Sequence, residues 1–362
     1  MPGMAVLVTT RDSVIYHRAA GVLDSVNGRA LATDAVFDIA SMTKPITSLA
    51  ALMLVDDGKL GLDDPASRFL PELEGREVLV GVDSANGRLI TRPSSREVTI
   101  RDLLRHTSGI AYSFSNHELH AAEVAARISG RRAPLVHDPG ARWTYGMGTA
   151  HLGWIIEQVS GMPLEEFFRQ RIFDPLEMHE TSFSLPPARA ARLMTGYRRR
   201  DGALQARSRP DSITSTCCGD GDLISTAGDY ARFMQLVLGN GKRRGTRLVS
   251  EASMAEMTRN QLGELTVVEQ PAVMPGLAAA FPDGAGRDGF GLGFQIAVDA
   301  PDGRPDGTLS WGGLYNTHFW IDPTNGIGVL VLTQVLPFYD HRVMEVLRSI
   351  ERTIYRPATT DS

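Results

Sequence analysis

The sequence predicts an α+β fold in which an antiparallel sheet is built from both chain ends and flanked by helices, while the middle is mainly helical. Strand-like runs occupy both ends, and helical patterns lie between them. We expect an α/β sheet part from residues 1–60 and 285–362, and a mainly helical part from residues 61–284. The two parts make one domain, and the cleft between them is the expected place for a small-molecule site.

Strand signals open the chain. Two β-rich runs, residues 4–10 and 13–22, are joined by a short polar turn, which predicts a hairpin. A smaller hairpin is expected at residues 78–93, where Asn86 and Gly87 supply the turn.

Four further strand-like runs lie between residues 289 and 335. Segments rich in Pro, Asp and Gly separate these runs, and no helix between them is long enough for a parallel crossover, so they predict an antiparallel meander. The first run opens with GFGLGF, residues 289–294, which lacks the spacing of a nucleotide-binding loop and is interpreted as a strand with bulges. A last helix is expected at residues 340–353.

Helical patterns fill the middle of the chain, and several of them end in glycine, as helix C-caps do. They cover residues 44–58, 99–109, 116–130, 148–161, 163–173 and 226–241.

Composition indicates a globular protein, with 43% hydrophobic residues among 362 and a formal net charge of −5. No long apolar run and no signal peptide are visible, so we expect no membrane span and a cytoplasmic location; a lost leader would make the location periplasmic. The mild, mixed charge gives no footprint for nucleic acid or a membrane surface, and the basic run Tyr197–Gly202 is interpreted as a solvated loop. Adjacent Cys217 and Cys218 match no zinc pattern and suit a reducing compartment. The composition predicts no oligomeric state.

The segment FDIASMTKPIT places Ser41 three residues before Lys44, with Pro45 directly after. Proline fits only the first turn of a helix, so a helix must begin close to Ser41. A serine at this place could simply cap the helix, but the free amides and the helix dipole would also stabilise an oxyanion.

Lys44 decides between these two roles. Residues three apart on a helix lie about 5–6 Å apart at Cβ, which brings the amine within reach of the serine hydroxyl, and a lysine in the first turn has no capping role. Of the 37 basic residues only three are lysines, so about 0.2 Ser-x-x-Lys matches are expected by chance. We therefore predict that Ser41 is a nucleophile and Lys44 its base.

Two further segments fit the same chemistry. An amine with an ordinary pKa of about 10.4 is protonated at pH 7, so a lysine base benefits from a second titrating partner. Tyr145, in TYGMG ahead of an amphipathic helix, would share one proton with it as a coupled pair. In LSWGGLYN, Gly312 and Gly313 let a ligand approach the backbone, and the Leu314 amide can donate to an oxyanion.

Ser41 with Lys44, Tyr145, and the Trp311–Gly313 segment resemble, in this order, the three active-site motifs of the serine β-lactamase and penicillin-binding protein superfamily. The chain is most similar to the class C β-lactamase-like branch known as family VIII carboxylesterases, and the similarity spans about residues 2–335. The resemblance extends to TIRDLLRHTSGI, FDPLEM, LISTAGDYARFMQLVLGNG and FWIDPTNGIGVLVLTQ.

That resemblance implies a β-lactamase/transpeptidase-like fold, with Ser41 as the acylated nucleophile and Lys44 with Tyr145 as the proton-transfer pair. The Ser41 and Leu314 amides would form the oxyanion hole. Substrate contacts are expected from Trp311, Gly312, Gly313, Tyr112 and Met147, and no cofactor or metal is expected.

Three departures from the family pattern bear on the substrate and the location. Trp311 replaces the lysine that attracts a substrate carboxylate, a contact worth roughly 1.5–3 kcal/mol, and its indole would offer apolar surface. Met147 replaces an asparagine that would bind the acyl amide of a β-lactam. Both changes favour neutral esters. The chain also starts directly on its first strand, where relatives generally have a helix.

Histidines suggest other sites. His106 in HTSG could indicate a Ser-His triad, but no Gly-x-Ser-x-Gly segment occurs, so His106 and Ser108 are interpreted as structural residues near the site. His117 and His120 have a spacing that can bind a metal, but no third ligand is evident, and a solvated helix face is expected.

The leading hypothesis is a serine hydrolase that cleaves small neutral carboxylic esters through a Ser41 acyl-enzyme. A related acyltransferase and a weak β-lactamase or D-peptidase are the alternatives within enzymes. A non-catalytic binding protein is the alternative outside them.

Overall fold

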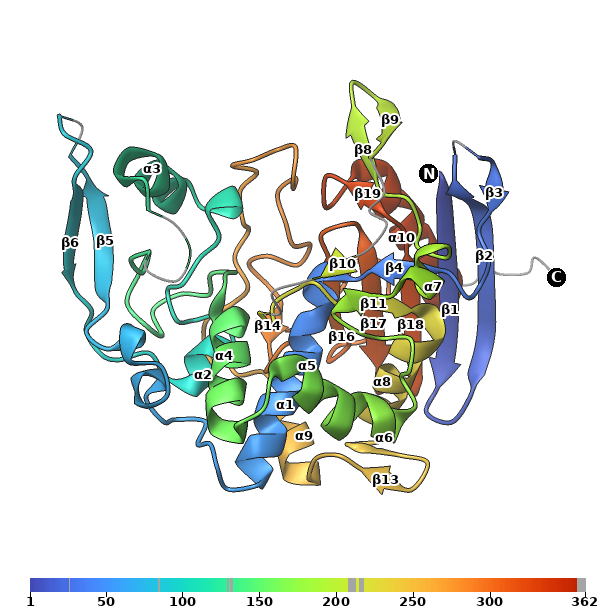
Figure 1. The fold of residues 1–362 in the computed structure, drawn as a ribbon, viewed down its shortest axis with the longest axis horizontal. Coiled ribbons are helices and arrows are strands. Elements are labelled where there is room, and N and C mark those ends of the chain that lie inside the picture. The colour runs from blue at the N-terminus through green and yellow to red at the C-terminus, as the bar shows by residue number, and fades with distance from the viewer. Residues whose placement is uncertain are drawn as a thin grey trace.

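An eight-stranded antiparallel sheet forms the centre of the computed structural model, with strand order β14-β15-β16-β17-β18-β1-β2-β3 (Figure 1). The structure describes residues 1–356 apart from 26, 84, 129, 131–132, 208–212 and 215–217. The strands are β1 (Gly3–Thr10), β2 (Val14–Asp24), β3 (Arg29–Ala30), β14 (Gly289–Phe290), β15 (Gln295–Ile296), β16 (Leu309–Gly313), β17 (Thr317–Asp322) and β18 (Ile327–Leu332). The predicted N-terminal hairpin, the C-terminal meander and their shared sheet are confirmed.

Strand β1 joins the two ends of the chain. It pairs with β2 on one side and with β18 on the other, where Ala5 lies opposite Leu332 and Thr10 lies opposite Ile327. Its side chains alternate between buried and half-buried, as expected for a strand with two different faces. Residues from the first and last parts of the chain are therefore held in one rigid layer.

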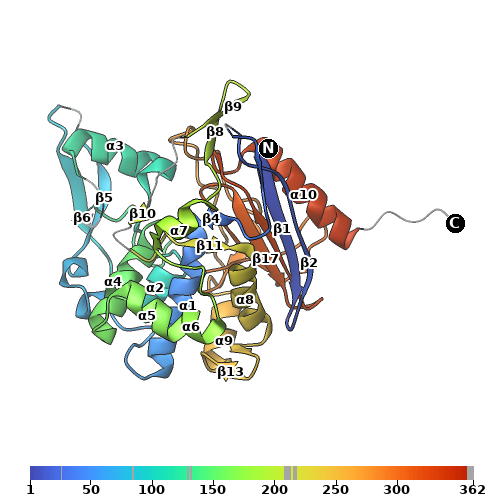
Figure 2. The same ribbon diagram turned by 45° about the vertical axis from the view of Figure 1, so that its right-hand side comes forward.

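Helices cover both faces of this sheet (Figure 2). On one face α10 (His341–Tyr355) packs Met344 and Leu347 against Trp320, Val329 and Val331. On the other face α8 (Ala227–Leu238) contacts β1, β17 and β18, and α1 (Lys44–Asp56) lies beyond it in the main core. No helix in the described part of the chain is long and apolar enough to cross a membrane.

The middle of the chain carries the predicted small hairpin, β5 (Glu77–Val82) with β6 (Leu89–Pro93), and helices in every predicted helical segment. These helices are α2 (Ile100–Leu104), α3 (His117–Ala126), α4 (Gly148–Ser160), α5 (Leu164–Phe168), a π-helical turn (Arg169–Phe173) and α6 (Asp174–Leu176). The sequence did not predict α9 (Glu251–Thr258), which buries Met254 and Met257.

Short elements complete the fold. They are β4 (Val36–Asp38), β7 (Ser184–Leu185), α7 (Pro187–Ala190), β10 (Ile213–Thr214), β11 (Ile224–Thr226), β12 (Lys242–Arg243), β13 (Thr246–Arg247), β19 (Val335–Leu336) and the 3₁₀ turns η1 (Ala40–Thr43), η2 (Ala66–Arg68), η3 (Pro71–Leu73) and η4 (Ser113–Ser115). The sequence predicts no zinc site at the adjacent Cys217 and Cys218. Cys217 lies outside the described residues.

The basic run Tyr197–Gly202 is not a solvated loop, so that prediction is wrong. Residues Tyr197–Arg200 form β8, which pairs with β9 (Ala203–Ala206) and with β19. Tyr197 is buried, and Arg199 forms a 2.5 Å ion pair with the buried carboxylate of Asp340. A distant acid therefore neutralises part of what looks, in the sequence, like an exposed charge run.

The GFGLGF segment is also not one bulged strand. It forms two short strands, β14 and β15, joined by a turn in which the Gly291 amide donates to the Phe294 carbonyl at 2.8 Å. Gly293 has a φ of +102°, and a Cβ at this residue would lie 2.7 Å from Ser48 Oγ. Glycine is needed here because the turn packs directly on α1.

Candidate active site

Ser41 sits in a 3₁₀ turn, η1, that leads directly into α1. Pro45 occupies the first turn of α1, as its missing amide proton requires. The turn is tied down by Thr43 Oγ1, which donates to the Ala40 carbonyl at 2.7 Å, and by the Tyr230 hydroxyl, which donates to the Met42 carbonyl at 3.0 Å. The sequence thus positions Ser41 at the start of a buried helix.

The Ser41 side chain does not cap this helix. Lys44 Nζ donates to Ser41 Oγ at 3.1 Å, and the Tyr145 hydroxyl donates to the same oxygen at 2.7 Å. Neither η1 nor α1 has a side-chain cap at its N-terminus. The geometry therefore excludes the capping role for Ser41 and places two proton-carrying groups at its hydroxyl.

Lys44 is 1% exposed and makes two further hydrogen bonds. Its amine donates to the Tyr112 hydroxyl at 3.1 Å and to the Asp220 carbonyl at 2.5 Å. It also lies 5.0 Å from the centroid of the Tyr145 ring. The amine is therefore held from three directions, and one of the three is the hydroxyl of Ser41.

Tyr112, which the sequence analysis placed among the substrate contacts, lies beside Lys44. Its hydroxyl also donates a short hydrogen bond to the carboxylate of Asp220. Burial, and then the nearby Asp220 carboxylate, raise the pKa of Tyr112 well above its usual value. The Tyr112 phenol therefore stays protonated at neutral pH.

Asp220, which touches both Lys44 and Tyr112, is not among the residues predicted from the sequence. The one local signal is its setting in Gly219-Asp220-Gly221-Asp222, where a glycine on each side of an acid permits close approach of the backbone. Asp220 and Lys44 are 176 residues apart in the chain, so the contact depends on the whole fold.

Glycines bring the site segments together. A Cβ on Gly146 would overlap the Ile110 carbonyl oxygen, so the residue after Tyr145 has to be glycine for the Tyr145 and Tyr112 loops to meet. A Cβ on Gly313 would overlap the Ile39 carbonyl oxygen, so the end of β16 reaches the η1 backbone for the same reason.

The end of β16 brings Leu314 toward the Ser41 turn. Strand β16 contacts η1, and Thr317 Oγ1 donates to the Ile39 carbonyl at 3.4 Å. Within the described part of the chain, neither the Ser41 amide nor the Leu314 amide donates a hydrogen bond to the protein. Both amides are thus available to an oxyanion, the role that the resemblance implies for them.

Trp311 does not offer open apolar surface, so that part of the sequence interpretation is wrong. The side chain is 6% exposed and packs 5.1 Å from the Tyr145 ring, between centroids. It points toward the core face of the sheet, where Trp143 and Phe290 surround it. Its direct effect is therefore on Tyr145, which it holds in place.

His106 belongs to the same aromatic cluster. Its ring lies 5.0 Å from Tyr145 and 6.5 Å from Trp311, between centroids. Burial, and then the charge of Lys44, lower the pKa of His106 to about 3, so the ring is neutral at physiological pH. Ser108 Oγ accepts a hydrogen bond from the Ile110 amide at 3.2 Å. His106 and Ser108 thus stabilise the loop that carries Tyr112.

Met147 and Tyr112 line a cavity of about 330 Å³ in the helical part. Apolar side chains, including Ile110, Phe114 and Leu119, form much of the remaining wall. A cavity of this kind fits an apolar acyl or alcohol group.

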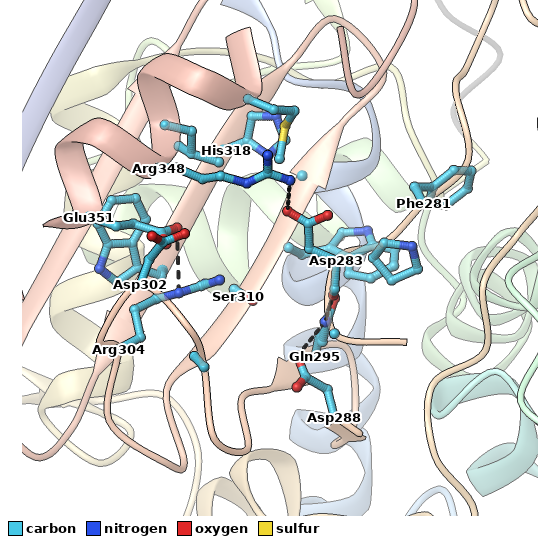
Figure 3. Close-up of a pocket in the computed structure, with 18 of the residues that line it drawn as sticks. Phe281, Asp283, Asp288, Gln295, Asp302, Arg304, Ser310, His318, Arg348 and Glu351 are labelled. Atoms are coloured by element: carbon cyan, nitrogen blue, oxygen red, sulfur yellow. Dashed lines mark hydrogen bonds and ion pairs between the residues drawn. The ribbon is translucent and has the colours of Figure 1, made fainter. Parts of the chain in front are cut away.

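Another cavity, of about 270 Å³, lies between β16, β17 and α10 (Figure 3). Most of its charged side chains pair with one another, as in the 2.8 Å bridge from Arg348 to Asp283 and the 3.4 Å pair of Arg304 with Glu351. Its wall includes Gly312 but none of the three residues proposed to react. We assign no substrate binding to this self-neutralised cavity.

The two histidines with metal-ligand spacing, His117 and His120, lie on α3. His117 is exposed and His120 is half-buried on α3. Among the described residues no group of three or more His, Cys, Asp or Glu could hold a metal ion.

Comparison with known proteins places this geometry in a family. A model of the beta-lactamase family matches residues 1–348. The chain belongs to the beta-lactamase family. Its fold is the beta-lactamase/transpeptidase fold, a large antiparallel sheet with flanking helices, as the resemblance implied.

Relatives within the beta-lactamase family include acyl-transferring and ester-cleaving enzymes. Protein Rv1367c of Mycobacterium tuberculosis is 34% identical over 358 residues, 93% of this chain and 86% of the relative. Monacolin J acid methylbutanoyltransferase of Aspergillus terreus is 30% identical over 90% of this chain and 83% of its own. Esterase EstB of Burkholderia gladioli is 29% identical over 91% of this chain and 85% of its own length.

A solved structure agrees with these relatives. A variant of simvastatin synthase from Aspergillus terreus superposes with a TM-score of 0.84 at 29% identity, covering 98% of this chain and 92% of the synthase. This member of the beta-lactamase family is accordingly a hydrolase or acyl-transfer enzyme.

Proposed function

We propose that the protein is a serine carboxylesterase that cleaves small neutral esters through a Ser41 acyl-enzyme. The observation that carries this proposal is that Ser41 Oγ lies within hydrogen-bond distance of both Lys44 Nζ and the Tyr145 hydroxyl. A serine hydroxyl is a weak nucleophile until an adjacent group removes its proton, and here two such groups converge on it.

The proposed reaction has two halves. Ser41 Oγ attacks the acyl carbon while its proton passes to the Lys44/Tyr145 pair, and the carbonyl oxygen becomes negative between the Ser41 and Leu314 amides. The pair then returns the proton to the oxygen of the leaving alcohol as the ester C–O bond breaks. Water attacks the acyl-enzyme in the second half, with the same pair taking the proton and returning it to Ser41.

Two features support neutral substrates. Trp311 occupies the sequence position at which the resembling family has a lysine that attracts a substrate carboxylate, and its side chain is buried against Tyr145. Met147, in place of an amide side chain, faces the apolar cavity beside Tyr112. An ester with an apolar acyl or alcohol group loses nothing from either change, whereas a carboxylate loses a charge-assisted contact.

Acyl transfer to an alcohol or amine is the second candidate, because relatives with over 80% of their own length aligned carry that activity in their names. Product analysis separates the two: the wild-type protein is given a p-nitrophenyl ester with a competing alcohol or amine at graded concentrations. Free acid as the main product supports hydrolysis, and a new ester or amide supports transfer. Nitrocefin turnover, run in parallel, reports β-lactamase activity.

Ser41→Ala tests the proposal directly. We expect loss of p-nitrophenyl ester hydrolysis by at least about 10³-fold, together with loss of fluorophosphonate labelling measured by intact mass. Ser349→Ala, at an exposed serine on α10, is the matched control and should keep both. Unchanged turnover in Ser41→Ala would refute the acyl-enzyme, and absence of wild-type labelling and turnover would favour a non-catalytic binding protein. The cytoplasmic location and the absence of nucleic-acid or membrane partners stay predictions.

A further inference from the structure

We propose that Asp220 is a positioning residue for Lys44. Its carboxylate accepts the proton of the Tyr112 hydroxyl in a hydrogen bond, so the Tyr112 oxygen and the Asp220 carbonyl accept two hydrogen bonds from the Lys44 amine. The third bonding direction of the amine then points at Ser41. This inference rests on the proposed function and deepens it. Asp220 does not touch Ser41 in the described hydrogen bonds, so its effect must pass through Tyr112 and Lys44.

Close packing holds the Asp220 loop. A Cβ on Gly219 would lie 3.1 Å from Gly153 Cα on α4 and 3.2 Å from a methyl of Thr47 on α1. Thr47 Oγ1 also donates to the Gly219 carbonyl. A Cβ on Gly153 would overlap the Cys218 carbonyl oxygen, so the loop and α4 meet backbone to backbone. The carboxylate is therefore presented from a fixed loop.

The direction of each hydrogen bond follows from the number of protons available. A carboxylate only accepts, so the single proton of the Tyr112 hydroxyl is given to Asp220. The Tyr112 oxygen is then free to accept a hydrogen bond, which the Lys44 amine donates at 3.1 Å. A second amine proton goes to the Asp220 carbonyl at 2.5 Å.

With two directions of the amine committed to acceptors, the third faces Ser41 Oγ at 3.1 Å. In the neutral amine that direction carries the lone pair, which accepts the Ser41 proton. In the protonated amine, the same direction carries the third N–H. The positive charge is then connected to the Asp220 carboxylate through the Tyr112 hydroxyl. Asp220 thus orients the base and stabilises the charge that the base acquires.

Other groups surround this chain of hydrogen bonds. His106 and Tyr145 face Lys44 from the helical part, and the His106 ring stays neutral. Asp222, which is exposed, acts on Tyr112 through its charge, and the Tyr145 ring lies 5.2 Å from the Tyr112 ring, between centroids. Asp38 precedes the Ser41 turn, and burial raises the pKa of this acid to about 7, with Asp222 and Arg207 acting on it.

Asp220→Asn tests the inference, because it keeps the size of the side chain and removes the charge. Asp222→Asn is the matched control, an exposed acid in the same loop whose left-handed backbone (φ 70°) asparagine tolerates. The readouts are kcat/KM for a p-nitrophenyl ester across pH and the melting temperature.

We expect Asp220→Asn to lower kcat/KM at pH 7 by about 10- to 100-fold and to move the acid limb of the pH profile to lower pH by about one unit. Asp222→Asn should keep kcat/KM within about twofold of the wild-type value. The acid limb of its pH profile should move less than that of Asp220→Asn. In a Tyr112→Phe background, Asp220→Asn should change kcat/KM by no more than about twofold, because the connecting hydroxyl is already gone.

Two results would overturn the inference. One is an acid limb that does not move in Asp220→Asn; the other is a full additional loss on top of Tyr112→Phe. Either result, with Ser41→Ala inactive, removes Asp220 alone and leaves the proposed function standing. Activity retained in Ser41→Ala would instead remove the proposed function itself.

Discussion

The hydroxyl of Tyr145 donates a 2.7 Å hydrogen bond to Ser41 Oγ, from a ring that is 3% exposed. Trp311 and His106 pack against this ring, and Gly146 lets the following backbone lie against the Ile110 carbonyl. The phenol is therefore fixed by its surroundings, which is what a group that exchanges a proton with Ser41 requires.

Tyr145→Phe should lower kcat of ester hydrolysis by about 10²- to 10⁴-fold, because it removes the hydroxyl and keeps the packing. Steady-state kinetics with a p-nitrophenyl ester measure the effect. Tyr16→Phe, at an exposed tyrosine on β2, should behave as wild type. Near-normal kcat in Tyr145→Phe would leave Lys44 as the only proton acceptor.

Lys44→Arg should be almost as inactive as Lys44→Ala, at least about 10²-fold below wild type. A guanidinium keeps the charge but does not deprotonate in proteins, so Lys44→Arg lacks a base at this 1% exposed position. Lys242→Arg, at an exposed lysine, should be unaffected. Substantial activity in Lys44→Arg, measured in the same assay, would contradict the role of Lys44 as a base.

Gly313→Ala should displace the end of β16, because the new methyl group would overlap the Ile39 carbonyl oxygen next to the Ser41 turn. We expect a loss of about 1–3 kcal/mol in the free energy of unfolding, measured in urea, together with reduced kcat. Gly81→Ala is the control, since a Cβ there meets no atom within 4 Å. A stable, fully active Gly313→Ala protein would argue against a close approach of β16 to Ser41.

Asp102 should make stability depend on acid pH. This buried carboxylate of α2 accepts from Arg96 at 2.5 Å and Thr107 at 2.8 Å. Burial alone would raise the pKa of Asp102, but the hydrogen bonds from Arg96, the Thr99 amide and Thr107 outweigh it and lower the pKa from 3.8 to about 2. Because the folded pKa is the lower one, the stabilisation is present above pH 3.8 and is lost as the pH falls through 2.

We therefore expect Asp102 to contribute about 2 kcal/mol less to the free energy of unfolding at pH 2 than at pH 6. Urea unfolding of wild type and Asp102→Asn at both pH values measures this, and the gap between the two proteins should narrow in acid. Asp12→Asn, at an exposed acid, should show no such narrowing. A constant gap for Asp102→Asn would contradict the assignment.

The predictions that the structure agrees with rest on local sequence patterns. Pro45 requires a helix start, and the spacing from Ser41 to Lys44 then places hydroxyl and amine together within one turn, independent of the rest of the fold. The alternation in β1 and the turn residues of the meander are equally local. These signals are enough to predict the shared sheet and the contact between the Ser41 hydroxyl and the Lys44 amine.

The features that the sequence did not predict depend on contacts between residues far apart in the chain. Asp220 meets Lys44 across 176 residues, and Arg199 meets Asp340 across 141, so neither contact leaves a mark in its neighbourhood of the sequence. The orientation of Trp311 depends on which face of β16 is buried, and both faces of that strand are covered in this fold. An indole in a strand therefore does not show by itself whether it faces a ligand or the core.

The pairing of β1 with β18 sets the order in which this enzyme is assembled during synthesis. Ala5 is synthesised long before its ladder partner Leu332. Until then the nascent chain carries an open edge on β1, which invites pairing with other chains. Ser41 likewise waits for Gly313 to close against Ile39. A chain that ends before Gly313 would therefore lack both the β18 partner of β1 and the contact that closes the Ser41 turn, so activity requires synthesis beyond both segments.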